Sequence, residues 1–187
     1  MSDRAMPDPI SLFERATRRA DAVMAGVAPA QLSAPTPCSA WTVQQLIDHM
    51  VGGTAYLLSA LSGRQPSEPR AGASLADYRA GVAEVLAGLR EPGALERRCQ
   101  SPLNFEWSLG EATAGTFMDQ LIHTWDLATS TGQDATLDPE LVAVCSAMFL
   151  PDMPEMGRAG GLVGPPVAVP DDASPQARLL GAMGRQP

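Results

Sequence analysis

Lysine is absent from the sequence: all 13 basic residues are arginine, set against 21 acidic residues in a chain of 187. The missing lysine excludes Schiff-base catalysis and a phosphate-loop lysine for nucleotide hydrolysis. The net charge of −8, with no stripe of basic residues, argues against nucleic acid or an anionic membrane as the main partner. A small-molecule substrate is the expected partner.

Cysteine is also scarce. Cys38, Cys99 and Cys145 are odd in number and far apart, which argues against a disulfide framework or a thiolate zinc knuckle. Each is expected to be a small buried hydrophobe, and for Cys38 a place beside a functional site is the alternative. No apolar run is long enough to span a membrane, and the amino terminus lacks the apolar core of a signal peptide. These features predict a protein of the reducing cytoplasm.

Aromatic residues make up only 5% of the chain, which favours helices over a β-sandwich. Capping boxes at Thr42–Gln45 and Ser108–Glu111 mark two helix starts, and Gly132 marks a helix end. The apolar spacing predicts helices at residues 9–26, 42–61, 74–89, 108–131 and 138–150, with a short last helix from residue 174. Gly52–Gly53, inside the second helix, predict close packing or a local kink.

Three stretches show no helical period. Residues 62–73 are expected to form a mobile connection, and residues 91–107 irregular chain with at most a short extended piece. Residues 151–173 hold nine prolines and glycines in 23 residues, so we expect a lid, an arm or a disordered segment. No repeat or shift in composition marks a boundary, so residues 1–187 are expected to form one helical, metal-binding domain.

The chain's two histidines fall on two of the predicted helices. His49 lies about 10 Å from the start of its helix, and His123 lies about 12 Å from the end of its own. If these helices run antiparallel, the imidazoles meet at the same level, whereas in a parallel pair they miss by about two turns. Asp119 precedes His123 by four residues and Asp126 follows it by three, so all three share one helix face.

Two histidines and one carboxylate from facing helices are a common open metal site, with positions left for water or substrate. His49, Asp119 and His123 are therefore candidate ligands of a divalent metal. The alternative is a partly buried His123 that only hydrogen-bonds to Asp119 or Asp126. Zinc suits this set, and nickel, iron and manganese are alternatives. Asp126 has two open roles, as an outer partner that holds the His123 ring in one tautomer or as a solvent-facing residue. Asp48 is a poor candidate, because adjacent helical residues face different directions.

Two segments of the sequence resemble a known family. TPCSAWTVQQLIDHMVGG (36–53) and IHTWDLATSTGQ (122–133) are similar to segments of the DinB-like superfamily. The closer resemblance is to the N-terminal domain of mycothiol-dependent maleylpyruvate isomerase and its small single-domain relatives, whose end is similar to residues 164–185. The resemblance implies an all-α, DinB-like four-helix bundle with one long crossover, plus short additional helices.

The resemblance also implies how the metal is held: by a histidine of the second helix, and by a carboxylate and a histidine four residues apart on a later helix. Carried over, these are His49, Asp119 and His123. The family usually has glutamate at position 119. Because aspartate is shorter by a methylene, the ion would bind at a shifted position, through a water, or not at all. In the isomerase, the implied role of the metal is to lower the pKa of the mycothiol sulfur, which then attacks an electrophile.

The second domain of the isomerase has no counterpart in this sequence, so its particular reaction does not carry over. We expect metal-assisted thiol addition, transfer or isomerisation, with mycothiol as the candidate cofactor. The open alternatives are a metal-dependent hydrolase, a non-haem iron oxygenase, and a metal-free bundle that binds a small molecule or dimerises as a scaffold. Trp41 and Trp125 are expected in the core or lining the pocket. No general base is identified outside the metal ligands, and a homodimer is compatible with the sequence.

Overall fold

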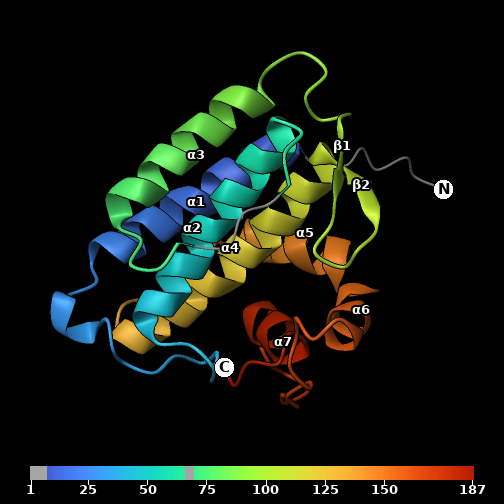
Figure 1. The fold of residues 1–187 in the computed structure, drawn as a ribbon. Helices are drawn as coiled ribbons and strands as arrows, with labels where there is room; N and C mark the ends of the chain where they lie inside the picture. Colours follow the sequence, from blue (N-terminus) through green and yellow to red (C-terminus); the bar gives the residue numbers. More distant parts are fainter. Residues whose placement is uncertain (1–7, 66–69) are drawn as a thin grey trace. The chain divides into compact units, whose positions relative to one another are not determined.

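A computed structural model describes residues 8–65 and 70–187 of the protein (Figure 1). Residues 1–7 and 66–69 lie outside the described residues, and with them parts of the amino terminus and of the connection over residues 62–73. The chain divides into two compact units, one ending at Ala135 and the other beginning at Thr136. That the two units act as one domain stays a prediction.

Helices dominate both units, as the sequence predicts. The first unit consists of α1 (Pro9–Ala25), a 3₁₀ turn (Pro29–Gln31), α2 (Val43–Leu61), α3 (Leu75–Leu89), β1 (Arg98–Gln100), β2 (Glu106–Ser108) and α4 (Leu109–Thr131). The second unit consists of α5 (Pro139–Phe149), α6 (Met153–Ala159) and α7 (Pro175–Ala182). Among the described helices, none has the length and apolar character needed to cross a membrane.

Polar caps explain where the two helices of the site begin. Thr42 Oγ1 accepts the backbone N–H of Gln45, and the Gln45 side chain accepts the backbone N–H of Thr42. The same reciprocal bonds join Ser108 and Glu111 at the start of α4. They satisfy backbone donors that have no partner within the helix. At its other end, α4 stops at Gly132, whose φ of 67° is left-handed and suits glycine.

Helices α2 and α4 run antiparallel. Gln120 on α4 donates its side-chain N–H to the carbonyl of Met50 on α2 at 3.0 Å. Farther along α2, the Tyr56 hydroxyl accepts the indole N–H of Trp107, which lies just before α4, at 2.8 Å. A Cβ added at Gly53, between these contacts, would lie 3.1 Å from Gln120 Nε2. This glycine therefore lets the two helices pack closely.

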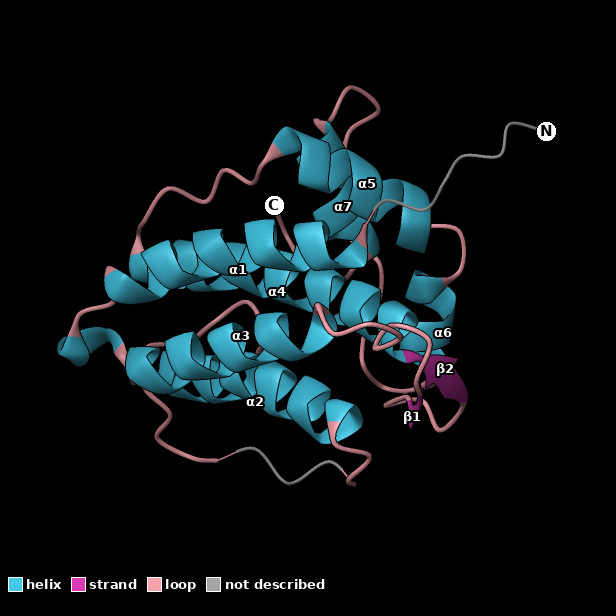
Figure 2. Cartoon of the chain, turned by 90° about the horizontal axis from the view of Figure 1, so that it is seen from above, coloured by secondary structure: helices cyan, strands magenta, loops and turns pink. Residues whose placement is uncertain are grey.

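Helix α3 packs beside α2 and runs in the same direction. A Cβ at Gly81 of α3 would clash with Thr54 of α2, and one at Gly88 would clash with Leu61, so the two helices advance together. Two consecutive parallel helices need a connection that returns along the bundle, and the one between α2 and α3 starts after Leu61 and ends before Leu75. Figure 2 shows α1 and α4 in one layer of the first unit and α2 and α3 in the other. The predicted all-α bundle with one long crossover is confirmed.

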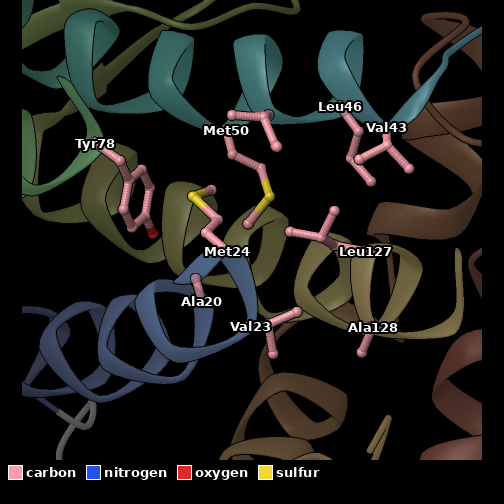
Figure 3. Packing of buried hydrophobic residues seen from close by; sticks show 10 residues of the cluster. Ala20, Val23, Met24, Val43, Leu46, Met50, Tyr78, Leu127 and Ala128 are labelled. Carbon is pink, nitrogen blue, oxygen red and sulfur yellow. The ribbon is translucent and has the colours of Figure 1, made fainter. Parts of the chain in front are cut away.

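Aliphatic and methionine side chains fill the bundle core. Figure 3 shows Met50 of α2 and Leu127 of α4 facing the side chains of α1, with the Tyr78 ring of α3 nearby. The Tyr78 hydroxyl is buried and donates to Gln120 Oε1 at 2.7 Å. Because Gln120 also bonds to the carbonyl of Met50, one buried amide joins α2, α3 and α4 next to Asp119.

Two segments predicted to be irregular contain regular structure. Strands β1 and β2 pair antiparallel, with Cys99 opposite Trp107. Strands of three residues are too short for an alternating pattern to show in the sequence. Helix α6 lies within residues 151–173 although it contains Pro154, because the first helical turn tolerates proline. That this segment acts as a lid or arm stays a prediction.

Candidate metal centre

Helices α2 and α4 bring the chain's two histidines together. The ring centroids of His49 and His123 are 4.7 Å apart, with an interplanar angle of 76°. Asp119, one turn before His123, lies between the two rings. Its Oδ1 is 3.0 Å from His49 Nε2 and 3.3 Å from His123 Nε2. The structure agrees with the prediction that antiparallel helices bring the two imidazoles to the same level. The three predicted ligands lie close together.

The donor atoms of His49, Asp119 and His123 fit a divalent metal ion. All three atoms lie within 4.8 Å of one another. Nitrogen and oxygen ligands bind zinc at about 2.0–2.2 Å, so neighbouring donors of one ion lie roughly 3.0–3.5 Å apart. The two contacts of Asp119 Oδ1 have this spacing. Aspartate at position 119 thus reaches both histidines despite its shorter side chain. The spacing suits several divalent ions and does not select among them.

Asp126 lies on the other side of the His123 ring. Its Oδ2 is 2.8 Å from His123 Nδ1, and its side chain is fully buried. A carboxylate at this distance accepts the Nδ1–H, and it would keep the proton on Nδ1 when Nε2 binds a metal ion. Asp126 is therefore not solvent-facing. Its role as the outer partner of a metal ligand stays a prediction.

The charges in the cluster shift the pKa values of its members. Burial alone would raise the pKa of Asp119, but the positive charges of His49 and His123 lower it well below its usual range. Burial alone would lower the pKa of His123, but Asp119 and Asp126 raise it well above the ordinary value. The carboxylate is therefore ionised, and a metal ion has to displace the proton of His123.

An open cleft of about 200 Å³ lies beside the cluster. The residues that line it are Trp41, Gln45, Asp48, His49 and Ala71. The Trp41 ring centroid is 4.5 Å from that of His49 and 5.7 Å from that of His123, so this indole forms a wall next to the candidate ligands. Trp125, in contrast, is 6% exposed and is not among the described residues that line the cleft.

Asp48 supports the cleft without joining the candidate ligands. Its carboxylate accepts the backbone N–H groups of Gly72 at 3.2 Å and Ala73 at 2.8 Å, and the side-chain N–H of Gln44 at 2.8 Å. These bonds fix the end of the crossover against α2, beside Ala71. Sequence reasoning missed this role, because no local pattern pairs Asp48 with residues more than twenty positions away.

Cys38 lies beside the candidate ligands, so the structure agrees with the alternative prediction and not with a small buried hydrophobe. It is half-buried, its Sγ–H donates to Asp126 Oδ2 at 3.4 Å, and its Sγ lies 3.9 Å from His123 Nδ1. With these two residues it forms a second group of candidate metal ligands. The feature of the sequence that could have indicated this place is the position of Cys38 in the loop just before Trp41 and the start of α2.

The comparisons with known proteins agree with this fold and site. The family model of the mycothiol maleylpyruvate isomerase N-terminal domain matches residues 13–128. The chain belongs to this family. Two uncharacterized proteins of Mycobacterium tuberculosis, MT0763 (strain CDC 1551 / Oshkosh) and Rv0738 (strain ATCC 25618 / H37Rv), are each 37% identical over 144 residues. The alignment covers 72% of this chain and 73% of each relative. No solved structure matches the chain significantly.

The match to the mycothiol maleylpyruvate isomerase N-terminal domain covers the whole candidate site. The matched range, residues 13–128, contains Cys38, Trp41, His49, Asp119, His123 and Asp126. The second unit lies outside it. The protein is therefore a mycothiol-related, DinB-like helical bundle with side chains that fit a divalent metal site.

Proposed function

We propose that this protein is a metal-dependent enzyme in which a metal-activated low-molecular-weight thiol of the mycothiol type attacks a small electrophilic substrate. The reaction class is S-transfer or isomerisation. The observation that carries the proposal is the convergence of His49 Nε2, Asp119 Oδ1 and His123 Nε2 beside an open cleft. The family match supports the choice of thiol, because the family is named for mycothiol.

His49, Asp119 and His123 would hold the ion, and zinc suits this donor set. When bound, a divalent ion lowers the pKa of a thiol that coordinates it, so that the sulfur is a nucleophilic thiolate at neutral pH. The side chains of His49 and Asp119 are 33% and 30% exposed, whereas that of His123 is 9% exposed. A small thiol therefore approaches past the first two residues.

The neighbouring side chains orient the ligands and the substrate. Asp126 accepts the N–H of His123 and keeps the ring in the tautomer that directs Nε2 toward the ion. Trp41 offers a flat apolar face beside His49, against which an apolar part of the thiol or of the electrophile packs. Asp48 lines the cleft and holds the backbone of Gly72 and Ala73 against α2.

The test is an activity assay on zinc-reconstituted protein with a small aromatic electrophile, with and without mycothiol. We expect thioether formation that needs both zinc and mycothiol and that is lost in His49→Ala. The matched control is Asp21→Asn, because Asp21 pairs with Arg79 and is not among the candidate metal ligands. This variant should keep wild-type activity.

Other outcomes would assign another function or none. Ester hydrolysis that needs zinc but no thiol would favour a metal-dependent hydrolase on the same three ligands. If zinc binds but neither reaction occurs, a non-catalytic binding bundle becomes the better description. Activity that survives His49→Ala would contradict the proposed centre.

A further inference from the structure

The ring of His123 lies between two carboxylates, one at each nitrogen. Asp119 Oδ1 is 3.3 Å from Nε2, and Asp126 Oδ2 is 2.8 Å from Nδ1. A neutral imidazole carries one proton and offers one lone pair, and its bonding partners decide which nitrogen keeps the proton. Here either tautomer has an acceptor for its N–H. Either nitrogen of His123 is therefore free to bind a metal while the other donates to an aspartate.

The Nδ1 side has a complete set of donors of its own. Cys38 Sγ lies 3.4 Å from Asp126 Oδ2 and 3.9 Å from His123 Nδ1, and the latter two atoms are 2.8 Å apart. Zinc binds thiolate sulfur at about 2.3 Å and nitrogen or oxygen at about 2.0–2.2 Å, so donors on one ion lie roughly 3–4 Å apart. The three atoms thus have spacings close to those of a metal site without a change of fold.

The two sides of His123 differ in the softness of their donors. The Nε2 side combines two imidazoles with a carboxylate, His49, His123 and Asp119. The Nδ1 side combines a sulfur, an imidazole and a carboxylate, Cys38, His123 and Asp126. Thiolate ligands select soft cations, whereas nitrogen and oxygen ligands also suit harder ions such as Mn²⁺. Opposite sides of one ring therefore suit different classes of metal.

We propose that the site has two alternative metal positions on opposite nitrogens of His123, and that cations softer than zinc, such as Cd²⁺, take the position formed by Cys38, His123 Nδ1 and Asp126. On binding, the Cys38 thiol and His123 Nδ1 each lose a proton to solvent, and the remaining imidazole proton stays on Nε2, where Asp119 accepts it. Because the ring offers one lone pair at a time, the two positions exclude each other. The inference shares His123 with the proposed function but does not require catalysis.

The experiment titrates metal-free protein with Cd²⁺ as the soft probe and with Mn²⁺ as the harder one. Bound Cd²⁺ is counted by equilibrium dialysis, and coordination by sulfur is read from the ultraviolet thiolate-to-cadmium charge-transfer band. We expect this band in the wild type and its loss in Cys38→Ser. The band should remain in His49→Ala. It should also remain in the matched control Cys99→Ser, which removes the other half-buried thiol. Mn²⁺ binding should show the opposite pattern, with loss in His49→Ala and retention in Cys38→Ser.

A readout without substitution guards against a variant that fails to fold. Alkylation of wild-type protein by iodoacetamide, mapped by mass spectrometry, should lose the adduct at Cys38 when Cd²⁺ is present but not when Mn²⁺ is present. The proposal is overturned if saturating Cd²⁺ gives no thiolate band, if the band survives Cys38→Ser, or if His49→Ala abolishes it. Loss of Mn²⁺ binding alone would instead count against the ligand set in the proposed function, so the two failures are distinguishable.

Discussion

The substitution Asp126→Asn tests whether a buried carboxylate tunes the candidate metal ligand His123. Asparagine keeps the size of the side chain and an oxygen that can accept the Nδ1–H, but it removes the negative charge. In the structure this oxygen is 2.8 Å from Nδ1 and the side chain is fully buried, so solvent screens the interaction little. A charge-assisted hydrogen bond is roughly twice as strong as a neutral one.

The expected magnitude follows from that contact. Loss of an outer partner of a histidine ligand typically weakens metal binding by about 10–100-fold. This range corresponds to about 1.4–2.7 kcal/mol of binding free energy at 25 °C. The Asp126→Asn variant should therefore bind zinc with a dissociation constant raised by about one to two orders of magnitude.

Competition titration against a chromophoric zinc chelator, at one pH for all proteins, measures the change. Asp21→Asn serves as the control, because it also neutralises an aspartate, one that pairs with Arg79 and is not a candidate metal ligand. Its zinc affinity should match the wild type. An unchanged dissociation constant for Asp126→Asn, in a variant with a normal melting curve, would refute the reasoning about His123.

The remaining predictions concern the metal-free protein. Burial alone would lower the pKa of His123, but Asp119 and Asp126 raise it well above 6.5 in the fold. The stability from this protonated ring is therefore fully present below about pH 6.5 and is lost as the pH rises through the folded-state pKa. The free energy of unfolding, measured with urea at a series of pH values from about 6 upward, should fall as the pH rises. In His123→Ala it should depend less on pH. Tyr78→Phe should cost about 1–3 kcal/mol by leaving the buried Gln120 Oε1 without its donor, measured as a lower urea midpoint at an unchanged slope. A wild-type midpoint would contradict the assigned bond.

The parts that sequence predicts well depend on local chemistry. The capping boxes at Thr42 and Ser108 set the starts of α2 and α4, and Gly132 sets the end of α4. The rise of about 1.5 Å per residue then gives the distance of His49 and of His123 from the ends of their helices. For this reason the approach of the two histidines could be predicted before any tertiary contact was known.

The parts that sequence does not predict depend on contacts between distant residues. The hydrogen bond from Cys38 to Asp126 joins positions 88 residues apart, and no spacing rule connects them. The bonds from the backbone of Gly72 and Ala73 to Asp48 are of the same kind. Such pairs are fixed by how the loops before α2 and α3 pack, which depends on the assembled bundle rather than on local propensity.

The pairing of β1 with β2 and the helix α6 were not predicted for a different reason, although a short extended piece within residues 91–107 was expected. Strands β1 and β2 have three residues each, so the period of two has no length in which to appear. Helix α6 lies in a segment rich in proline and glycine, where composition argues for irregular chain. A proline in the first turn destabilises a helix little, so α6 forms although the composition of the whole segment disfavours a helix.

Metal content is the most direct test of the account. Untagged wild-type protein and His123→Ala, both purified without chelator and reconstituted with zinc, are analysed by elemental mass spectrometry beside a protein assay. We predict about one equivalent of bound metal in the wild type, as for a single three-ligand site, and none retained in His123→Ala. Wild-type protein that retains no metal after reconstitution, or a His123→Ala variant that retains a full equivalent, would contradict the central claim.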